Sequence, residues 1–144
     1  MKEQPDPLTG EEQELWRSFL SWSEQVVSLV SKDLAVAGIS VPDYQVLVRV
    51  HEGVGHSLGQ FELSNSLGWS PSRLSHQLSR MEKKGMLTRT EVGTGRLMQV
   101  TLTDHGKELI KNAISVHAKS VRRHFLDAVA EQRDCLTEIF NRRP

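Results

Sequence analysis

Hydrophobic side chains recur at intervals of three and four residues along the first long segment of the chain, residues 11–37. Leu15, Phe19, Val26 and Val30 fall on one face at this spacing, as they do in an amphipathic helix. A glycine follows directly, at the position where helices commonly end. The pattern predicts one long N-terminal helix with more apolar surface than a small intramolecular core requires.

Three shorter helices are predicted next, over residues 42–52, 61–67 and 71–84. The first and the third open on a proline, which suits the first position of a helix. Ser70 can cap the third helix, and Gly68 ends the second. Two short helices joined by a tight turn that contains glycine are typical of a helix-turn-helix.

The periodicity changes from helical to alternating after Gly85. Residues 86–91 and 96–102 are predicted to be two short strands, because apolar and polar side chains alternate in the second of them. The glycine-containing tetrapeptide 92–95 between them permits a tight hairpin. A two-stranded hairpin directly after a helix-turn-helix indicates a wing, here residues 86–102.

Two further helices are predicted after the hairpin, one from Asp104 with a broad apolar surface and a final one from about Asp127. The predicted fold is therefore mainly α with a small β-hairpin wing. Its winged helix-turn-helix spans residues 42–103, and the helical segments 11–38 and 104–142 form a dimerisation region. A compact pairing of these helices within one chain is the alternative explanation for their apolar surface.

The net charge of the chain is zero, but the charges are unevenly distributed. Residues 1–63 hold four Lys or Arg and ten Asp or Glu, a net charge of −6, whereas residues 64–100 hold six and two, a net charge of +4. A local positive patch attracts phosphate even in a neutral protein, because salt screens charges beyond about 8 Å. The basic central segment suits a nucleic-acid partner, although a solvated basic face without a partner would carry the same charge.

The predicted helix 71–84 presents polar side chains opposite an apolar stripe of Leu74, Leu78 and Met81. In a major groove, arginine can read guanine and glutamine can read adenine, while serine contacts bases or phosphates. The N-terminal half of this face lacks the acidic residues that are usual on a solvated helix, which favours DNA recognition. The candidate DNA-binding residues of this segment are Ser70, Ser72, Arg73, Ser75, His76, Gln77 and Arg80.

The wing adds two candidate DNA-binding residues, Arg89 and Arg96. Arg96 follows the glycine turn, so its side chain is expected at or near the tip of the hairpin. An arginine there can enter a narrow minor groove, where the negative potential is enhanced. An exposed arginine in a mobile loop is the alternative interpretation.

Three segments together resemble the MarR family of multiple-antibiotic-resistance regulators: residues 74–87 (LSHQLSRMEKKGML), Gly95-Arg96, and residues 100–106 (VTLTDHG). The resemblance covers residues 11–142. It implies a homodimer whose first and last helices interdigitate and whose paired recognition helices enter successive major grooves of a pseudo-palindromic operator. It also implies that a ligand or a chemical modification often releases the DNA.

The chain departs from the family pattern at Thr94, where most members carry an aspartate that braces the wing through an ion pair. The departure leaves the rigidity of the wing and its share of DNA affinity open. His76 stands where many members have arginine. A histidine in that place would make DNA binding sensitive to pH near the reference pKa of ~6.5.

One set of residues could line an effector pocket between the dimerisation helices and the DNA-binding region, where the resemblance places small-molecule sites. The ligand expected there is small and either aromatic or amphipathic. A hydrophobic core or a dimer interface would require the same residue types. The candidate ligand-binding residues are Trp16, Phe19, Trp22, Val46, Val50 and His51.

No catalytic, metal or cofactor site is expected. His51 and His56 are five residues apart with two glycines between them, whereas the zinc-protease motif needs histidines four apart on one helical face. His105, His117 and His124 could form a metal site, but exposed or interface histidines explain them better.

The sequence as a whole predicts a transcription regulator that binds specific double-stranded DNA, and not an enzyme. We expect a cytoplasmic homodimeric repressor that a small-molecule effector releases from its operator. No apolar run approaches the roughly 20 residues that cross a bilayer. The single Cys135, expected to be buried or at an interface, fits a reducing compartment. The alternative is a winged-helix protein-interaction module without specific DNA binding.

Overall fold

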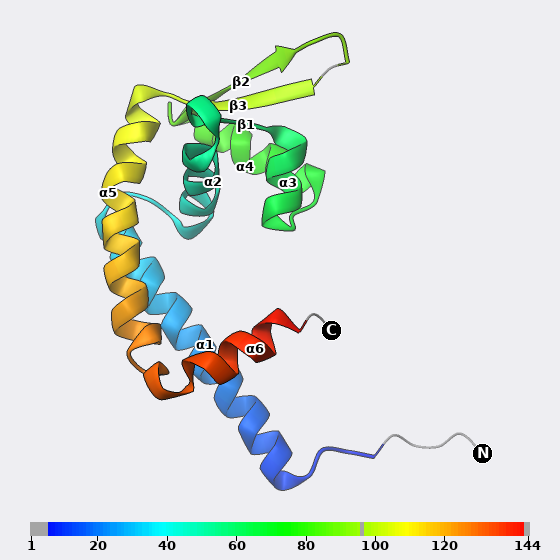
Figure 1. Cartoon of the computed structure of the whole chain (residues 1–144), viewed down its shortest axis with the longest axis vertical. Coiled ribbons are helices and arrows are strands. Elements are labelled where there is room, and N and C mark those ends of the chain that lie inside the picture. Colours follow the sequence, from blue (N-terminus) through cyan, green and yellow to red (C-terminus); the bar gives the residue numbers. More distant parts are fainter. Residues whose placement is uncertain (1–5, 96, 143–144) are drawn as a thin grey trace, which may run out of the picture.

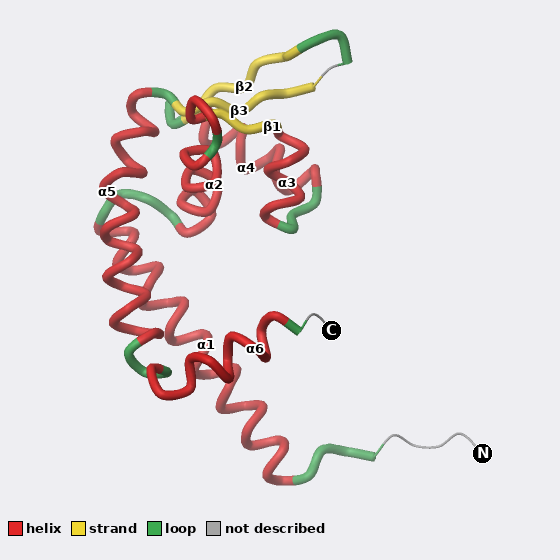
Figure 2. Tube along the Cα trace, in the orientation of Figure 1, coloured by secondary structure: helices red, strands yellow, loops and turns green. Residues whose placement is uncertain are grey.

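The computed structural model describes residues 6–95 and 97–142. The chain forms a winged helix-turn-helix lobe, and a long helical arm extends from it (Figure 1). Helices α1 (Gly10–Val36) and α5 (Asp104–Val121) pack against each other where the arm joins the lobe. Helices dominate, with one small sheet at the far end of the lobe, which confirms the predicted fold class (Figure 2). Within the described ranges, no helix combines the length and the apolar character that a membrane span requires.

Helix α1 agrees with its prediction to within one residue at each end. Thr9 and Glu12 form a capping box, in which Thr9 Oγ1 accepts from the Glu12 amide at 3.2 Å and Glu12 Oε2 accepts from the Thr9 amide at 2.9 Å. These bonds satisfy amide groups that the first helical turn leaves free. Further along, Leu34 is wholly buried, and the ring of Trp22 packs on that of Phe125 at 5.8 Å between centroids. The C-terminal part of α1 is therefore anchored to the rest of the chain.

The lobe is built on the helices α2 (Val41–Glu52), α3 (Gln60–Leu67) and α4 (Pro71–Lys83), which confirm the three predicted helices to within one residue. Helix α3 ends at Gly68, whose φ of +66° is a left-handed conformation that favours glycine. The turn that follows leads directly into α4. The lobe's wholly buried core side chains include Val46, Leu47, Val50, Leu63, Leu74, Leu78, Met81 and Val100.

The sheet has one strand more than the sequence analysis predicts. Strands β2 (Leu87–Val92) and β3 (Leu97–Leu102) form the expected antiparallel hairpin, and β1 (Ser57–Gly59) pairs with the other edge of β3. Ser57 lies opposite Thr101, with their hydroxyl oxygens 2.9 Å apart. A three-residue strand is too short to show an alternating pattern, so its pairing with β3 defines it.

The last helix begins later than predicted. The expected start at about Asp127 is wrong, because a π-helical turn (Arg122–Leu126) and a 3₁₀ turn (Ala130–Gln132) precede α6 (Arg133–Asn141). The Asp127 amide donates to the carbonyl of Arg122, five residues earlier. The hydrogen-bonding register of the helix therefore changes here, and the chain reverses direction before α6 (Figure 1).

Candidate nucleic-acid interface

Most of the polar face predicted for α4 points away from the core. Ser72, Arg73, His76 and Arg80 are exposed, whereas the apolar stripe on the other side of the helix is wholly buried. Ser70 is the N-cap, and its Oγ accepts a hydrogen bond from the Arg73 amide at 3.1 Å. The first turns of α4 thus offer several hydrogen-bonding side chains to a partner.

Arg73 lies above an aromatic ring that the sequence analysis did not single out. Its guanidinium carbon is 4.1 Å from the centroid of the Trp69 ring, which is a cation–π contact. Trp69 is half-buried in the turn before α4, so it provides a supported platform for Arg73. A side chain positioned before binding loses less conformational entropy when it binds. The signal in the sequence was a tryptophan four residues before an arginine, just ahead of a helix start.

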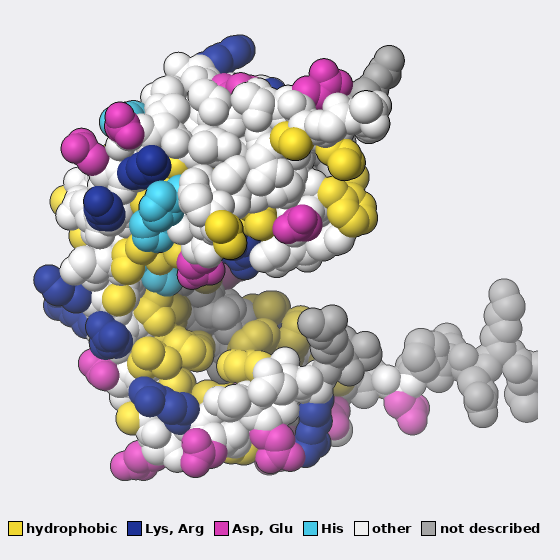
Figure 3. All heavy atoms as spheres, turned by 45° about the horizontal axis from the view of Figure 1, so that its top comes forward, with side chains coloured by type: hydrophobic (Ala, Val, Ile, Leu, Met, Phe, Trp, Pro, Cys, Tyr) yellow, Lys and Arg dark blue, Asp and Glu magenta, His cyan; other side chains and the backbone are white. Residues whose placement is uncertain are grey.

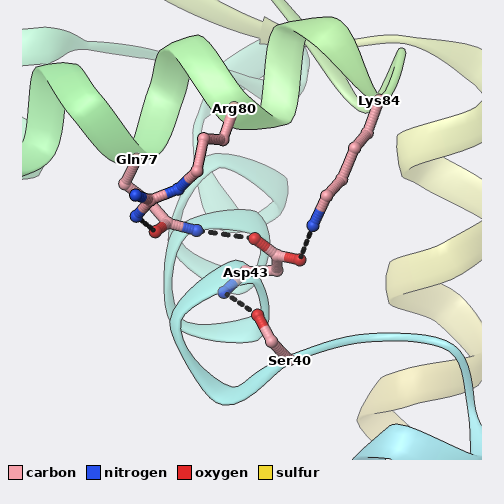
Figure 4. Close-up of polar contacts among 5 residues, drawn as sticks. All are labelled: Ser40, Asp43, Gln77, Arg80 and Lys84. Atoms are coloured by element: carbon pink, nitrogen blue, oxygen red, sulfur yellow. Dashed lines mark hydrogen bonds and ion pairs between the residues drawn. The ribbon is translucent and has the colours of Figure 1, made fainter.

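Gln77 does not lie on the exposed face, so its predicted exposure to DNA bases is wrong. Its side chain is buried at 5% exposure, and both ends of its amide are engaged (Figure 4). Nε2 donates to Asp43 Oδ1 at 2.6 Å, and Oε1 accepts from Arg80 Nη2 at 2.6 Å. Gln77 follows Leu74 by three residues and precedes Met81 by four, which places it at the edge of the buried stripe. Its role is to hold α4 in place and to orient Arg80.

A buried carboxylate connects α2 to α4 at this point. Asp43 is only 2% exposed; besides the Gln77 amide, it accepts from Lys84 Nζ, which is 3.3 Å from Oδ2. Ser40, the N-cap of α2, accepts from the Asp43 amide at 3.2 Å. A buried charge is tolerated when it is paired and hydrogen-bonded. The position of α4 therefore depends on α2 through Asp43 (Figure 4).

Arg89, predicted to bind DNA, joins the base of the wing to α4 through bonds within the protein, and its contact with DNA stays a prediction. Its Nη2 lies 2.7 Å from Glu82 Oε1 and 2.9 Å from Ser79 Oγ, and its Nη1 lies 3.5 Å from Ser75 Oγ. Only 18% of the side chain is exposed. Charge-assisted hydrogen bonds of this kind are strong and directional, so Arg89 fixes β2 against α4.

The second predicted arginine of the wing, Arg96, is expected at the tip of the hairpin from the sequence and lies outside the described residues. Thr94, at the position of the expected aspartate, is exposed. The contacts between Arg89 and Glu82 lie away from this tip and do not involve residue 94. The base of the wing is therefore braced without the aspartate.

The residues predicted to line an effector pocket do not meet in one site. Val46 and Val50 are wholly buried in the core of the lobe, so they present no surface to a ligand in the single chain, and their ligand-binding role stays a prediction. His51 stacks on His56, with ring centroids 4.7 Å apart. Trp16 and Phe19 pack on each other in the first turns of α1, in the part of the arm far from the lobe (Figure 1).

The arm exposes a large apolar surface in the single chain. Trp16 is 51% exposed and Leu15 73%, and hydrophobic side chains line the hollow between the lobe and the arm (Figure 3). Cys135 of α6 is also exposed in the single chain, which leaves the interface as the remaining part of its prediction. The exposed large hydrophobic residues of α1 and α6 include Leu15, Trp16, Phe19, Leu20, Trp22, Val27, Ile139 and Phe140.

Two histidines of the C-terminal half have protein partners where the arm joins the lobe. The His117 ring stacks on Tyr44 at 4.2 Å between centroids, and burial lowers the pKa of His117. Asp33 Oδ2 accepts from Ser120 Oγ at 2.7 Å and lies 3.2 Å from His124 Nε2; the bond from Ser120, followed by that from His124, lowers the pKa of Asp33. In the described part of the chain, no group of three or more His, Cys, Asp or Glu residues could hold a metal ion.

Solved structures provide the informative comparisons, since no protein-family model and no curated protein matches the chain. AbsC, a MarR family transcriptional regulator from Streptomyces coelicolor, is 32% identical with a TM-score of 0.83, over 95% of this chain and 97% of AbsC. Sco3205, a MarR family transcriptional regulator from the same organism solved in complex with DNA, is 31% identical with a TM-score of 0.87, over 95% of this chain and 88% of Sco3205. CouR from Rhodococcus jostii, solved with p-coumaroyl-CoA, is 27% identical with a TM-score of 0.66, over 81% of this chain and 85% of CouR.

Proposed function

The chain belongs to the MarR family of transcriptional regulators, and we propose that it binds specific, pseudo-palindromic sequences in double-stranded DNA. The observation that carries this proposal is the exposed polar face of α4, with Arg73 positioned over Trp69. A major groove admits an α-helix and presents a distinct hydrogen-bonding pattern for each base pair. Sco3205 supports the proposal, because it shares this fold and was solved with DNA.

In the proposed complex, the N-terminal half of α4 lies in the major groove. Arg73 and His76 face the base edges, and Ser72 and the amide groups of the first turn contact a phosphate. Arg80, oriented by Gln77, contacts the phosphate backbone. Arg96, expected from the sequence near the tip of the wing, would contact the neighbouring minor groove.

The proposed DNA-binding species is a homodimer formed through α1, α5 and α6. Its support is the group of exposed large hydrophobic side chains on α1 and α6, since a contiguous exposed apolar surface marks an interaction site. Two copies related by a twofold axis would place two α4 helices one DNA turn apart, about 34 Å, on a pseudo-palindrome.

The proposed role is that of a cytoplasmic repressor which a small-molecule effector releases from DNA. Support for an effector comes from CouR, which was solved with p-coumaroyl-CoA. The role is regulatory and not enzymatic, in line with AbsC and Sco3205, which are both transcriptional regulators.

Selection of bound duplexes from a random pool tests the proposal. We expect enrichment of one pseudo-palindromic sequence, and an affinity for it that falls steeply with salt, because phosphate contacts release counterions. Sedimentation of the selected complex should give two chains per duplex. A pool that stays random after repeated rounds would instead support the protein-interaction module, which Thr94 and the zero net charge favour.

The dimer has its own test in two substitutions on α1. Phe19→Glu places a charge in the exposed apolar surface, and sedimentation should show dissociation at micromolar concentration. Ser21→Glu adds the same charge on the same helix, at an exposed polar residue on the side opposite Phe19, and should leave the dimer intact. Equal behaviour of the two variants would place the interface elsewhere.

A further inference from the structure

A cavity of about 610 Å³ opens between the wing and the N-terminal parts of α3 and α4. Its volume falls in the range of small-molecule sites. The walls are mainly apolar and include Phe61, Leu74 and Leu97. Phe61 is 73% exposed and Leu97 65%, and Figure 3 shows hydrophobic side chains gathered on this edge of the lobe. The cavity therefore presents apolar surface that a ligand with an apolar body would cover.

The polar groups at this cavity mostly accept hydrogen bonds. Glu62 is exposed and is the only charged side chain among the described lining residues. One N–H of Gln99 and the hydroxyl of Ser64 are already engaged, since Gln99 Nε2 donates to Ser57 Oγ at 2.9 Å and Ser64 Oγ donates to the Trp69 carbonyl at 2.7 Å. Gln60 has a buried amide oxygen, which finds no hydrogen-bond donor among the described residues.

We propose that this cavity binds a small organic cation, an aromatic or aliphatic body that carries an ammonium or amidinium group. The body lies between Phe61 and Leu97, and the cationic group donates to the Glu62 carboxylate and the Gln99 amide oxygen. The one charge among the described lining residues is the Glu62 carboxylate, which attracts a cationic group more strongly than a neutral one of the same shape. None of the residues predicted to bind an effector belongs to this site.

The site also connects the two parts of the lobe that the proposed function assigns to DNA. Val92, Leu97 and Met98 belong to the wing, whereas Pro71 and Leu74 belong to the start of α4. A ligand between them fixes the distance from the wing to α4. The binding of the ligand and the binding of DNA are therefore coupled, and this part of the inference rests on the proposed function. We expect the cation to weaken DNA binding, because a ligand held between the outer part of the hairpin and the start of α4 resists any adjustment of their spacing to the two grooves.

Three naphthalene probes of similar shape test the site without DNA: 2-naphthylmethylammonium, 2-naphthylmethanol and 2-naphthoate. Calorimetric titration of the full chain should give affinity for the ammonium two- to fivefold above that for the alcohol, the range expected of an exposed ion pair. The carboxylate should bind about tenfold more weakly than the ammonium. Equal affinities for the three probes would overturn the assignment of a cation.

Two variants of the lining residues and one control variant show where the probes bind. Glu62→Gln should remove the preference for the ammonium over the alcohol, while Glu108→Gln, an exposed carboxylate on α5, should preserve it. Phe61→Ser should weaken all three probes about tenfold, because the ring covers the apolar body. Unchanged binding in both Glu62→Gln and Phe61→Ser would overturn the site. A change in self-association in Phe61→Ser would show instead that a second copy covers it.

The coupling to DNA is measured separately, with a duplex selected from the random pool. Saturating 2-naphthylmethylammonium should raise the Kd for this duplex at least threefold, and the duplex should raise the Kd of the amine by the same factor. Amine binding with an unchanged duplex Kd overturns the coupling. If no duplex is ever selected, the proposed function fails, while the calorimetric result still decides whether the cation site exists.

Discussion

Replacement of Asp43 by alanine tests the contact that holds α4 against α2. The carboxylate is 2% exposed, and it accepts a 2.6 Å hydrogen bond from Gln77, which is itself buried. Alanine removes a hydrogen bond to a charged group, worth about 1.5–3 kcal/mol, and leaves the Gln77 amide without a partner, at a cost of about 1–3 kcal/mol. These effects overlap, so we expect Asp43→Ala to lower the free energy of unfolding by about 2–4 kcal/mol.

Asp43→Asn separates the contribution of the hydrogen bond to stability from that of the charge. The asparagine oxygen can still accept from Gln77, in a bond about half as strong. The lost ion pair with Lys84 counts for less than 1 kcal/mol, because the Lys84 side chain is 55% exposed. We therefore expect Asp43→Asn to cost about 1–1.5 kcal/mol, clearly less than alanine.

Urea unfolding followed by far-UV circular dichroism measures these differences at one fixed protein concentration, because dimerisation contributes to apparent stability. Asp127→Ala, at an exposed carboxylate, is the control and should stay within about 0.5 kcal/mol of the wild type. Combining Asp43→Ala with Gln77→Ala should cost less than the sum of the two single changes, because both remove the same contact. Equal destabilisation by alanine and asparagine, or additivity in the double variant, would show that the hydrogen bond between Gln77 and Asp43 does not stabilise the fold.

Three further predictions concern the wing, the helix contacts and pH. Glu82→Gln should lower stability by about 1–2 kcal/mol in urea unfolding, because it weakens the bonds that hold Arg89 to α4; an unchanged midpoint would show that the brace contributes nothing. Gly106→Ala should cost about 3 kcal/mol, because a Cβ there would collide with the Met86 carbonyl, whereas Gly10→Ala, with open space around it, should be neutral. Burial holds the pKa of His117 below its usual 6.5, so the unfolded chain binds more protons as the pH falls through 6.5, and stability is lost toward acid. His117→Phe should reduce this loss between pH 7 and pH 5 in thermal unfolding, and an identical pH profile would contradict it.

Much of the fold follows from periodicity in the sequence. The three- and four-residue spacing of apolar side chains predicts α1 to α4 within one residue, since each helix carries its apolar side chains on one face. Strand β1 could not be predicted in this way, because it is three residues long and becomes a strand only by pairing with β3. The start of α6 was missed because the residues before it remain helical in π and 3₁₀ turns.

The residues of the candidate site show a different limit of prediction from the sequence. Polar side chains at the edge of an apolar stripe can face either way, and the buried partner Asp43 that decides for Gln77 lies 34 residues earlier in the chain. The same holds for Arg89, whose partner Glu82 lies on the preceding helix. A sequence shows that such residues can hydrogen-bond, but tertiary contacts decide whether a bond is made within the protein or to DNA.

The residues predicted to line an effector pocket are not brought together in one site, for a related reason. Aromatic and aliphatic side chains suit a pocket, a core and a dimer surface equally well. The structure places Val46 and Val50 in the core and leaves Trp16 exposed on the arm. Residue type alone does not distinguish among these environments.

Whether α4 recognises the base sequence of the DNA is tested most directly by measuring the affinity of Arg73→Ala. The measurement covers the selected duplex and all of its single-base variants. The account predicts that this variant loses discrimination at one base position in each half-site, by about 1–3 kcal/mol, and keeps discrimination at the other positions. Arg133→Ala, which removes an exposed arginine from α6, should bind every duplex as the wild type does. An equal loss of affinity for all duplexes in Arg73→Ala would contradict the account, because Arg73 would then contact only the phosphate backbone.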